Sequence, residues 1–138
     1  MDHEYLVMKL GNIKGIDFLE EHQKVIKKYG YVDFARTGKR RIDFSCLNEP
    51  YFFIKESLSG GNRIIRAYID KDSAGDKKTP DYYANLNLSN ASWVRINRLE
   101  TIDRSGFLIE YTLKNGNKIK ALDNGAVSYF YIIKSKKE

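Results

Sequence analysis

Arginine and aromatic residues alternate with aliphatic residues in two segments that read as β-strands. Arg66 and Tyr68 lie two positions apart in one segment, and Trp93 and Arg95 lie two positions apart in the other. Because side chains alternate between the faces of a strand, each pair shares the face opposite its aliphatic neighbours. A guanidinium group binds phosphate and an aromatic ring stacks on a base, so the pattern favours nucleic-acid binding. Ordinary strand packing, with Trp93 covered by the loop at 71–90, explains the same pattern.

A second candidate is the basic run Arg36-Thr37-Gly38-Lys39-Arg40-Arg41, which places four positive charges at a predicted turn. A phosphate backbone would be attracted to it, with an affinity that falls steeply as salt rises. A solvated turn around Gly38 is the structural alternative. The chain contains 24 Lys+Arg against 18 Asp+Glu, and its net charge of +6 favours an anionic partner.

Residues that could catalyse a reaction or bind a metal are poorly arranged. His22 falls on the apolar face of a predicted helix and is expected to be a packed core histidine. Cys46 is the only cysteine, which excludes an internal disulfide and any zinc site built from cysteine pairs. The aspartates of the 71–90 loop match no EF-hand spacing. We therefore predict no catalytic residues, no metal and no cofactor, with a nuclease that uses His22 or loop carboxylates as the weaker enzymatic alternative.

One helix is predicted near the N-terminus, over residues 16–29. Its apolar residues recur at helical spacing, its acidic residues come first and its lysines last, and Gly30 follows at the expected end. The remainder reads as sheet, with a hairpin of two strands, a long irregular loop at 71–90, a second hairpin around Asn115-Gly116 and a frayed tail at 135–138. Predicted strands are residues 5–10, 31–36, 51–55, 63–70, 93–97, 107–113, 117–122 and 127–134.

The 138 residues fit one domain, and hydrophobic residues make up 42% of them, which is enough for a packed core. One strand, one helix and then several strands predict a single α+β domain over residues 1–138, with a curved, mostly antiparallel sheet or a small barrel. No apolar run reaches the ~20 residues of a membrane helix, and a signal-peptide pattern is absent, so we expect a cytoplasmic protein with no membrane partner.

The order of these elements resembles the PUA-like superfamily, in particular domains of the EVE and YTH type. The resemblance rests on four strings of residues: Gly30–Thr37, Tyr51–Ile54, Ile64–Ile69 and Trp93–Ile96. It departs from the family pattern at Arg66, where a glycine is usual, and after the helix, where Tyr31 or Phe34 would replace a tryptophan. The resemblance implies a compact barrel that reads a modified base in DNA or RNA.

These observations lead to one principal hypothesis, a non-enzymatic domain that binds DNA or RNA. We expect the rings of Phe34, Tyr68 and Trp93 to form one aromatic surface or pocket that stacks on an extruded or single-stranded base. The cations would converge on the same place and contact the phosphates. The alternative is a small protein-binding module or inhibitor that presents its basic, tyrosine-rich face to an acidic protein. The predicted ligand-binding residues are Phe34, Arg36, Lys39, Arg40, Arg66, Tyr68, Trp93 and Arg95.

Overall fold

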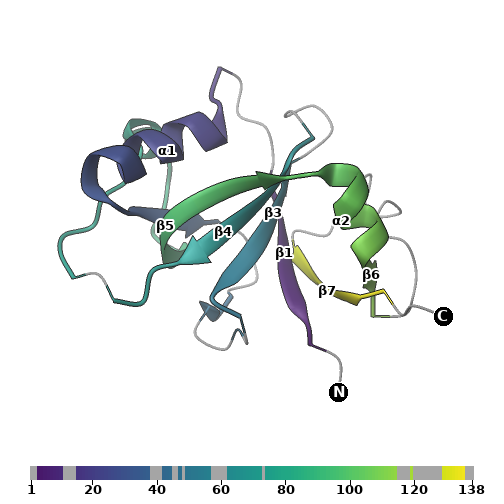
Figure 1. The fold of residues 1–138 in the computed structure, drawn as a ribbon. Helices are drawn as coiled ribbons and strands as arrows, with labels where there is room; N and C mark the ends of the chain where they lie inside the picture. The colour runs from purple at the N-terminus through teal and green to yellow at the C-terminus, as the bar shows by residue number, and fades with distance from the viewer. Residues whose placement is uncertain are drawn as a thin grey trace.

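A computed structural model provides the structure of the chain, and it describes residues 3–10, 15–37, 42–44, 47, 49–56, 62–72, 74–114, 119 and 129–135. The described elements are arranged as a sheet with two α-helices and one 3₁₀-helix (Figure 1). In chain order they are β1 (Tyr5–Leu10), α1 (Phe18–Tyr29), β2 (Val32–Arg36), β3 (Tyr51–Glu56), β4 (Ile64–Ile69), η3 (Asp81–Asn85), β5 (Ser92–Ile102), α2 (Arg104–Glu110), β6 (Tyr111–Leu113) and β7 (Tyr129–Lys134).

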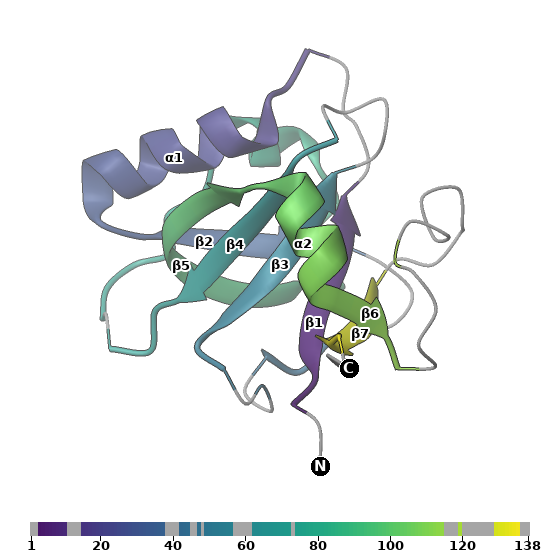
Figure 2. The same ribbon diagram turned by 45° about the vertical axis from the view of Figure 1, so that its right-hand side comes forward.

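The seven strands form one mixed sheet in the order β2-β5-β4-β3-β1-β7-β6. Only β1 and β3 run parallel, and the other five pairs are antiparallel. The sheet is strongly curled: β5 bends along its length, and β2 passes behind β4 and β3 (Figure 2). The prediction of an α+β domain with a mostly antiparallel, curved sheet is therefore confirmed. The sheet is not closed into a barrel by the described strands.

Each face of the sheet carries its own hydrophobic core. The inner face, toward which the sheet curls, bears Phe34, Phe52, Ile65 and Val94, and α1 packs on it. The outer face bears Phe53 and Ile64, which pack with Phe107 at the end of the sheet nearest α2 (Figure 2). Ile64, which lies two positions before Arg66 and so shares its face, is therefore fully buried. Farther from α2, the side chains of this face are partly exposed.

Helix α1 confirms the predicted helix at 16–29 but begins two residues later, at Phe18. The local sequence determines both of its ends. Asp17 caps the N-terminus by accepting a hydrogen bond from the backbone N–H of Glu20 at 3.2 Å. Gly30 ends the helix in the left-handed conformation, at φ +87°, which its missing Cβ permits. The helix buries His22 completely, as predicted for a core histidine.

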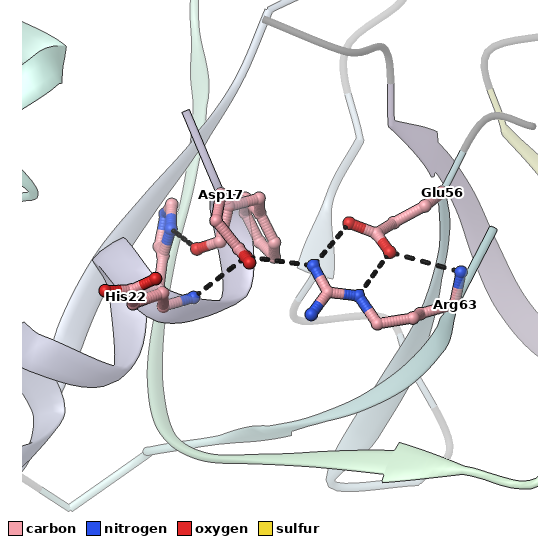
Figure 3. Close-up of polar contacts among 6 residues, drawn as sticks. Asp17, His22, Glu56 and Arg63 are labelled. Atoms are coloured by element: carbon pink, nitrogen blue, oxygen red, sulfur yellow. Dashed lines mark hydrogen bonds and ion pairs between the residues drawn. The ribbon is translucent and has the colours of Figure 1, made fainter. Parts of the chain in front are cut away.

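The N-terminus of α1 is attached to the hairpin of β3 and β4 by Arg63 (Figure 3). The Arg63 guanidinium donates to Asp17 Oδ1 at 2.9 Å and to both carboxylate oxygens of Glu56, at 2.6 and 3.0 Å. These charge-assisted bonds lower the pKa of Asp17. The helix cap and the sheet are thus held by one shared cation.

The prediction of a strand at 107–113 is wrong for its first four residues, which belong to α2. Asp103 caps this helix by accepting from the N–H of Gly106 at 2.8 Å. Phe107 and Tyr111, spaced four residues apart, both bury their rings against Phe53. A seven-residue helix is too short for helical spacing to stand out from strand alternation.

Two other elements differ from the prediction in extent. Strand β5 continues to Ile102, five residues beyond the predicted end, and the 71–90 loop contains η3. Several predicted features lie outside the described residues: residues 115–117 of the second hairpin, residues 136–138 of the tail predicted at 135–138, the strand at 117–122 apart from Ile119, and Cys46. Among the described helices, none is long and apolar enough to cross a membrane.

Candidate nucleic-acid interface

Four of the predicted ligand-binding residues share the outer face of the sheet, on the adjacent strands β4 and β5. In the observed register, Arg66 lies opposite Glu100 and Tyr68 lies opposite Arg98. Trp93 and Arg95 project from the same face farther along β5, opposite residues of β2. All four predicted side chains are partly exposed. The alternation in the sequence therefore placed each pair on the correct face.

Arg66 lies at the centre of an arginine–tyrosine cluster, which we define as Tyr51, Arg66, Tyr68, Arg98 and Glu100. Its guanidinium carbon is 5.0 Å from the centre of the Tyr51 ring, and its Nη1 is 3.3 Å from Glu100 Oε1. The Arg66 Nε is buried and has no hydrogen-bond partner among the described residues. The cluster therefore holds a donor whose hydrogen bond is not satisfied within the described part of the chain.

Arg98 is the most exposed member of this cluster, and Tyr51 is partly buried. The Arg98 side chain is 63% exposed, donates to Glu100 Oε2 at 2.9 Å and stacks over the Tyr68 ring at 5.1 Å. Burial raises the pKa of Tyr51, so its hydroxyl keeps its proton at neutral pH and remains a donor. The cluster thus presents a cation and aromatic rings at the surface of the sheet.

Arg95 is fixed in place by Asp33 of the neighbouring strand β2. Its Nε donates to Asp33 Oδ1 at 2.9 Å, and its guanidinium carbon lies 4.1 Å from the centre of the Tyr31 ring. Asp33 Oδ2 also accepts from the backbone N–H of Lys78 at 2.7 Å. Asp33 therefore positions both Arg95 and the segment that follows Gly75.

The 71–90 loop packs along Trp93 without enclosing it. Lys77 Nζ lies 3.7 Å from the centre of the Trp93 ring, and the Tyr83 ring centre lies 6.4 Å away. An open groove of about 430 Å³ runs between Trp93 and this loop, with Pro80 and Leu88 also in its walls. Both interpretations of Trp93 are thus partly correct, because the loop covers one side of the ring and the groove leaves another accessible.

The expectation that all the predicted residues form one pocket is wrong, because Phe34 and Arg36 lie on the inner face. Phe34 is opposite Val94 in the β2–β5 register, is only 2% exposed, and packs edge-on against Phe18. Arg36 is 7% exposed, and its guanidinium carbon lies 4.9 Å from the centre of the Tyr129 ring. Lys39 and Arg40 lie outside the described residues.

Three residues of the outer face were not identified from the sequence. Tyr51 could have been found, since pairing the predicted hairpin places it opposite Tyr68. Arg98 could not have been found, because strict alternation from Trp93 and Arg95 places it on the inner face. An irregularity in the β4–β5 pairing, between Tyr68 and Ile69, shifts the alternation and brings Arg98 onto the outer face. Lys77 comes from the irregular loop, where no periodicity exists to place a side chain.

No cluster of three or more His, Cys, Asp or Glu side chains suited to a metal ion occurs among the residues that the structure describes. The chain matches no family model, no curated protein and no solved structure. The PUA-like resemblance therefore stays a prediction.

Proposed function

We propose that this protein is a nucleic-acid-binding domain that holds single-stranded or unpaired DNA or RNA on the outer face of its sheet. The observation that carries the proposal is the set of partly exposed Tyr, Trp and Arg side chains on β4 and β5. Sequence-tolerant binding of single strands requires these two kinds of group, rings on which bases stack and cations that follow the phosphates.

In the proposed mode, one base stacks on the accessible side of Trp93 within the groove, and another base farther along the same strand lies against Tyr68. The exposed guanidinium of Arg98 and the ammonium of Lys77 contact phosphates. Arg66 and Arg95 carry two further positive charges. These four cations outnumber the carboxylates of Asp33, Asp70 and Glu100, which interact with the three arginines. The excess positive charge gives the electrostatic attraction that non-specific binding needs.

The PUA-like resemblance adds a finer proposal, that the bound base is modified or extruded from a duplex. In that reading, the curled sheet corresponds to a PUA-like barrel. The domain would then prefer modified over ordinary bases, in addition to binding nucleic acid through the salt-dependent contacts of the outer face.

Fluorescence anisotropy with labelled single-stranded and duplex oligonucleotides tests the proposal. We expect preferential binding of the single strand, with an affinity that falls as the salt concentration is raised from low to moderate. Absence of binding, or an affinity that ignores salt, would contradict it. An interaction with an acidic protein is distinguished by pull-down with and without nuclease, since a protein partner is retained after the nuclease treatment.

A further inference from the structure

Glu100 is a carboxylate on the outer face, next to a ring against which the proposed function places a base. It lies on β5, and its side chain is 33% exposed. Its Oε1 atom accepts a hydrogen bond from the Tyr68 hydroxyl at 3.3 Å, so the carboxylate lies at the rim of the Tyr68 ring. Because stacked rings overlap, the edge of a base that lies on Tyr68 comes within reach of Glu100.

The Glu100 carboxylate retains the capacity to accept one more hydrogen bond. Its Oε1 also accepts from Arg66 Nη1 at 3.3 Å, and its Oε2 accepts from Arg98 Nη2 at 2.9 Å. A carboxylate offers about four lone-pair sites, two on each oxygen, and the described residues supply one donor to Oε2. The second site on Oε2 is therefore not used within the described part of the chain and can accept from a ligand.

The bases of nucleic acids differ in the donors that they offer to such an acceptor. Cytosine, adenine and guanine carry an exocyclic amino group, and the edge that bears it is accessible in a single strand. Uracil and thymine carry no amino group, and their ring N–H lies between two carbonyl oxygens, whose partial negative charge repels a carboxylate. A carboxylate beside the stacking position therefore favours the bases that carry an amino group.

We propose that Glu100 selects bases with an exocyclic amino group over uracil and thymine, by accepting a hydrogen bond from that group at Oε2. The inference rests on the proposed function, since the base must first lie on the outer face against Tyr68. The ion pairs with Arg66 and Arg98 hold the carboxylate in place and offset its repulsion of the phosphates. Glu100 thus determines specificity, whereas the rings and cations give an affinity that does not depend on sequence.

Matched oligonucleotides test this selection. Labelled oligodeoxycytidine and oligodeoxyuridine of equal length carry the same phosphates and differ only on the base edge that bears the amino group. In anisotropy titrations at neutral pH and one salt concentration, we expect the cytosine oligomer to bind about fivefold more tightly, as for one hydrogen bond between partly exposed groups. Equal affinities, or tighter binding of the uracil oligomer, would overturn the inference and leave the proposed function intact. If neither oligomer binds, the proposed function fails and this inference fails with it.

Variants, checked for folding by circular dichroism, separate the hydrogen bond from differences in stacking between the two bases. Glu100→Gln should bring the two affinities within about twofold of each other, because an amide can also donate to the uracil carbonyl. Asp76→Asn removes the same charge from an exposed loop position and should leave the preference unchanged. Tyr68→Phe removes a competing donor from Oε1 but keeps the ring, so the preference should remain. A preference that persists in Glu100→Gln, loss of all binding in that folded variant, or loss of the preference in Tyr68→Phe would each overturn the assignment to Glu100.

Discussion

The Nε2 atom of His22 lies 2.7 Å from the hydroxyl oxygen of Tyr83, which joins α1 to η3 across 61 positions of the chain. The same hydroxyl accepts a hydrogen bond from the backbone N–H of Ala35 at 3.2 Å, and His22 Nδ1 lies 2.9 Å from the carbonyl oxygen of Phe18. A neutral imidazole satisfies every group: Nδ1–H donates to Phe18, and Nε2 accepts from Tyr83. The helix, the 3₁₀-helix and the edge strand β2 are thereby held together.

This contact makes the stability of the protein depend on pH. Burial lowers the pKa of His22 from 6.5 to about 4. As the pH falls from 6.5 toward 4, the unfolded chain binds a proton that the folded chain does not, so stability is lost over this interval. The loss should reach about 3 kcal/mol, as expected for a shift of this size.

Urea unfolding of the unaltered protein and of His22→Phe, at about pH 7 and about pH 4.5, measures this contribution. The variant removes the titrating group, so the free energy of unfolding should fall less for it than for the unaltered protein. Equal falls in the two proteins would show that His22 does not titrate differently on folding.

The ion pair between Asp33 and Arg95 should contribute to stability and should fix the start of the 75–80 segment. We expect Asp33→Asn to lower the free energy of unfolding by about 2 kcal/mol, because the Asp33 and Arg95 side chains are only 9% and 18% exposed. Hydrogen exchange at the amide of Lys78, which donates to Asp33, should also become faster. Glu21→Gln, which breaks an ion pair with the 64% exposed Lys24, is the control and should leave the free energy of unfolding nearly unchanged. If both variants lowered the free energy of unfolding by similar amounts, the ion pair between Asp33 and Arg95 would not have the stabilising role proposed for it.

Arg63→Met should destabilise the fold by about 3 kcal/mol, because it leaves the carboxylate of Glu56, only 4% exposed, without its cation. Chemical denaturation provides the measurement. Adding Glu56→Gln should recover part of the loss, since the buried charge is then removed. Lys134→Met is the control, as its ion pair with Glu110 is exposed on both sides and should contribute less than about 1 kcal/mol. No recovery in the double variant would mean that Arg63 acts through packing alone.

Trp93→Leu should weaken the binding of single-stranded oligonucleotides by roughly tenfold or more, because stacking on one base contributes about 1–3 kcal/mol. Anisotropy titrations measure the effect, and circular dichroism confirms that the variant is folded. Tyr29→Leu removes an aromatic ring that is 43% exposed on α1, outside the outer face, and should leave the affinity unchanged. An equal loss in both variants would place the binding elsewhere.

The parts of the fold that local interactions determine could be predicted from the sequence. Helix α1 has its own cap at Asp17, its own end at Gly30 and twelve residues over which apolar spacing is clear. Helix α2 was missed because its seven residues depend on Phe107 and Tyr111 packing against Phe53, a contact between distant parts of the chain.

In the candidate site, too, the features that depend on contacts between distant parts of the chain could not be predicted from the sequence. Side-chain alternation correctly predicted that Arg66 and Tyr68 share one face of β4 and that Trp93 and Arg95 share one face of β5. Each prediction needs only the residues of a single strand. Whether Phe34 joins them depends on how β2 pairs with β5, and the observed pairing places Phe34 opposite Val94 on the inner face. Pairing between strands is determined by the whole sheet, so the sequence of β2 alone could not reveal it.

Mapping a short single-stranded oligonucleotide onto ¹⁵N-labelled protein by NMR tests the central proposal most directly. We predict saturable shifts that are concentrated at the backbone amides of Tyr68, Trp93 and Arg98, with little change along α1 at Gln23 and Lys27. Shifts confined to α1, or no saturable shifts at low salt, would contradict nucleic-acid binding by the outer face.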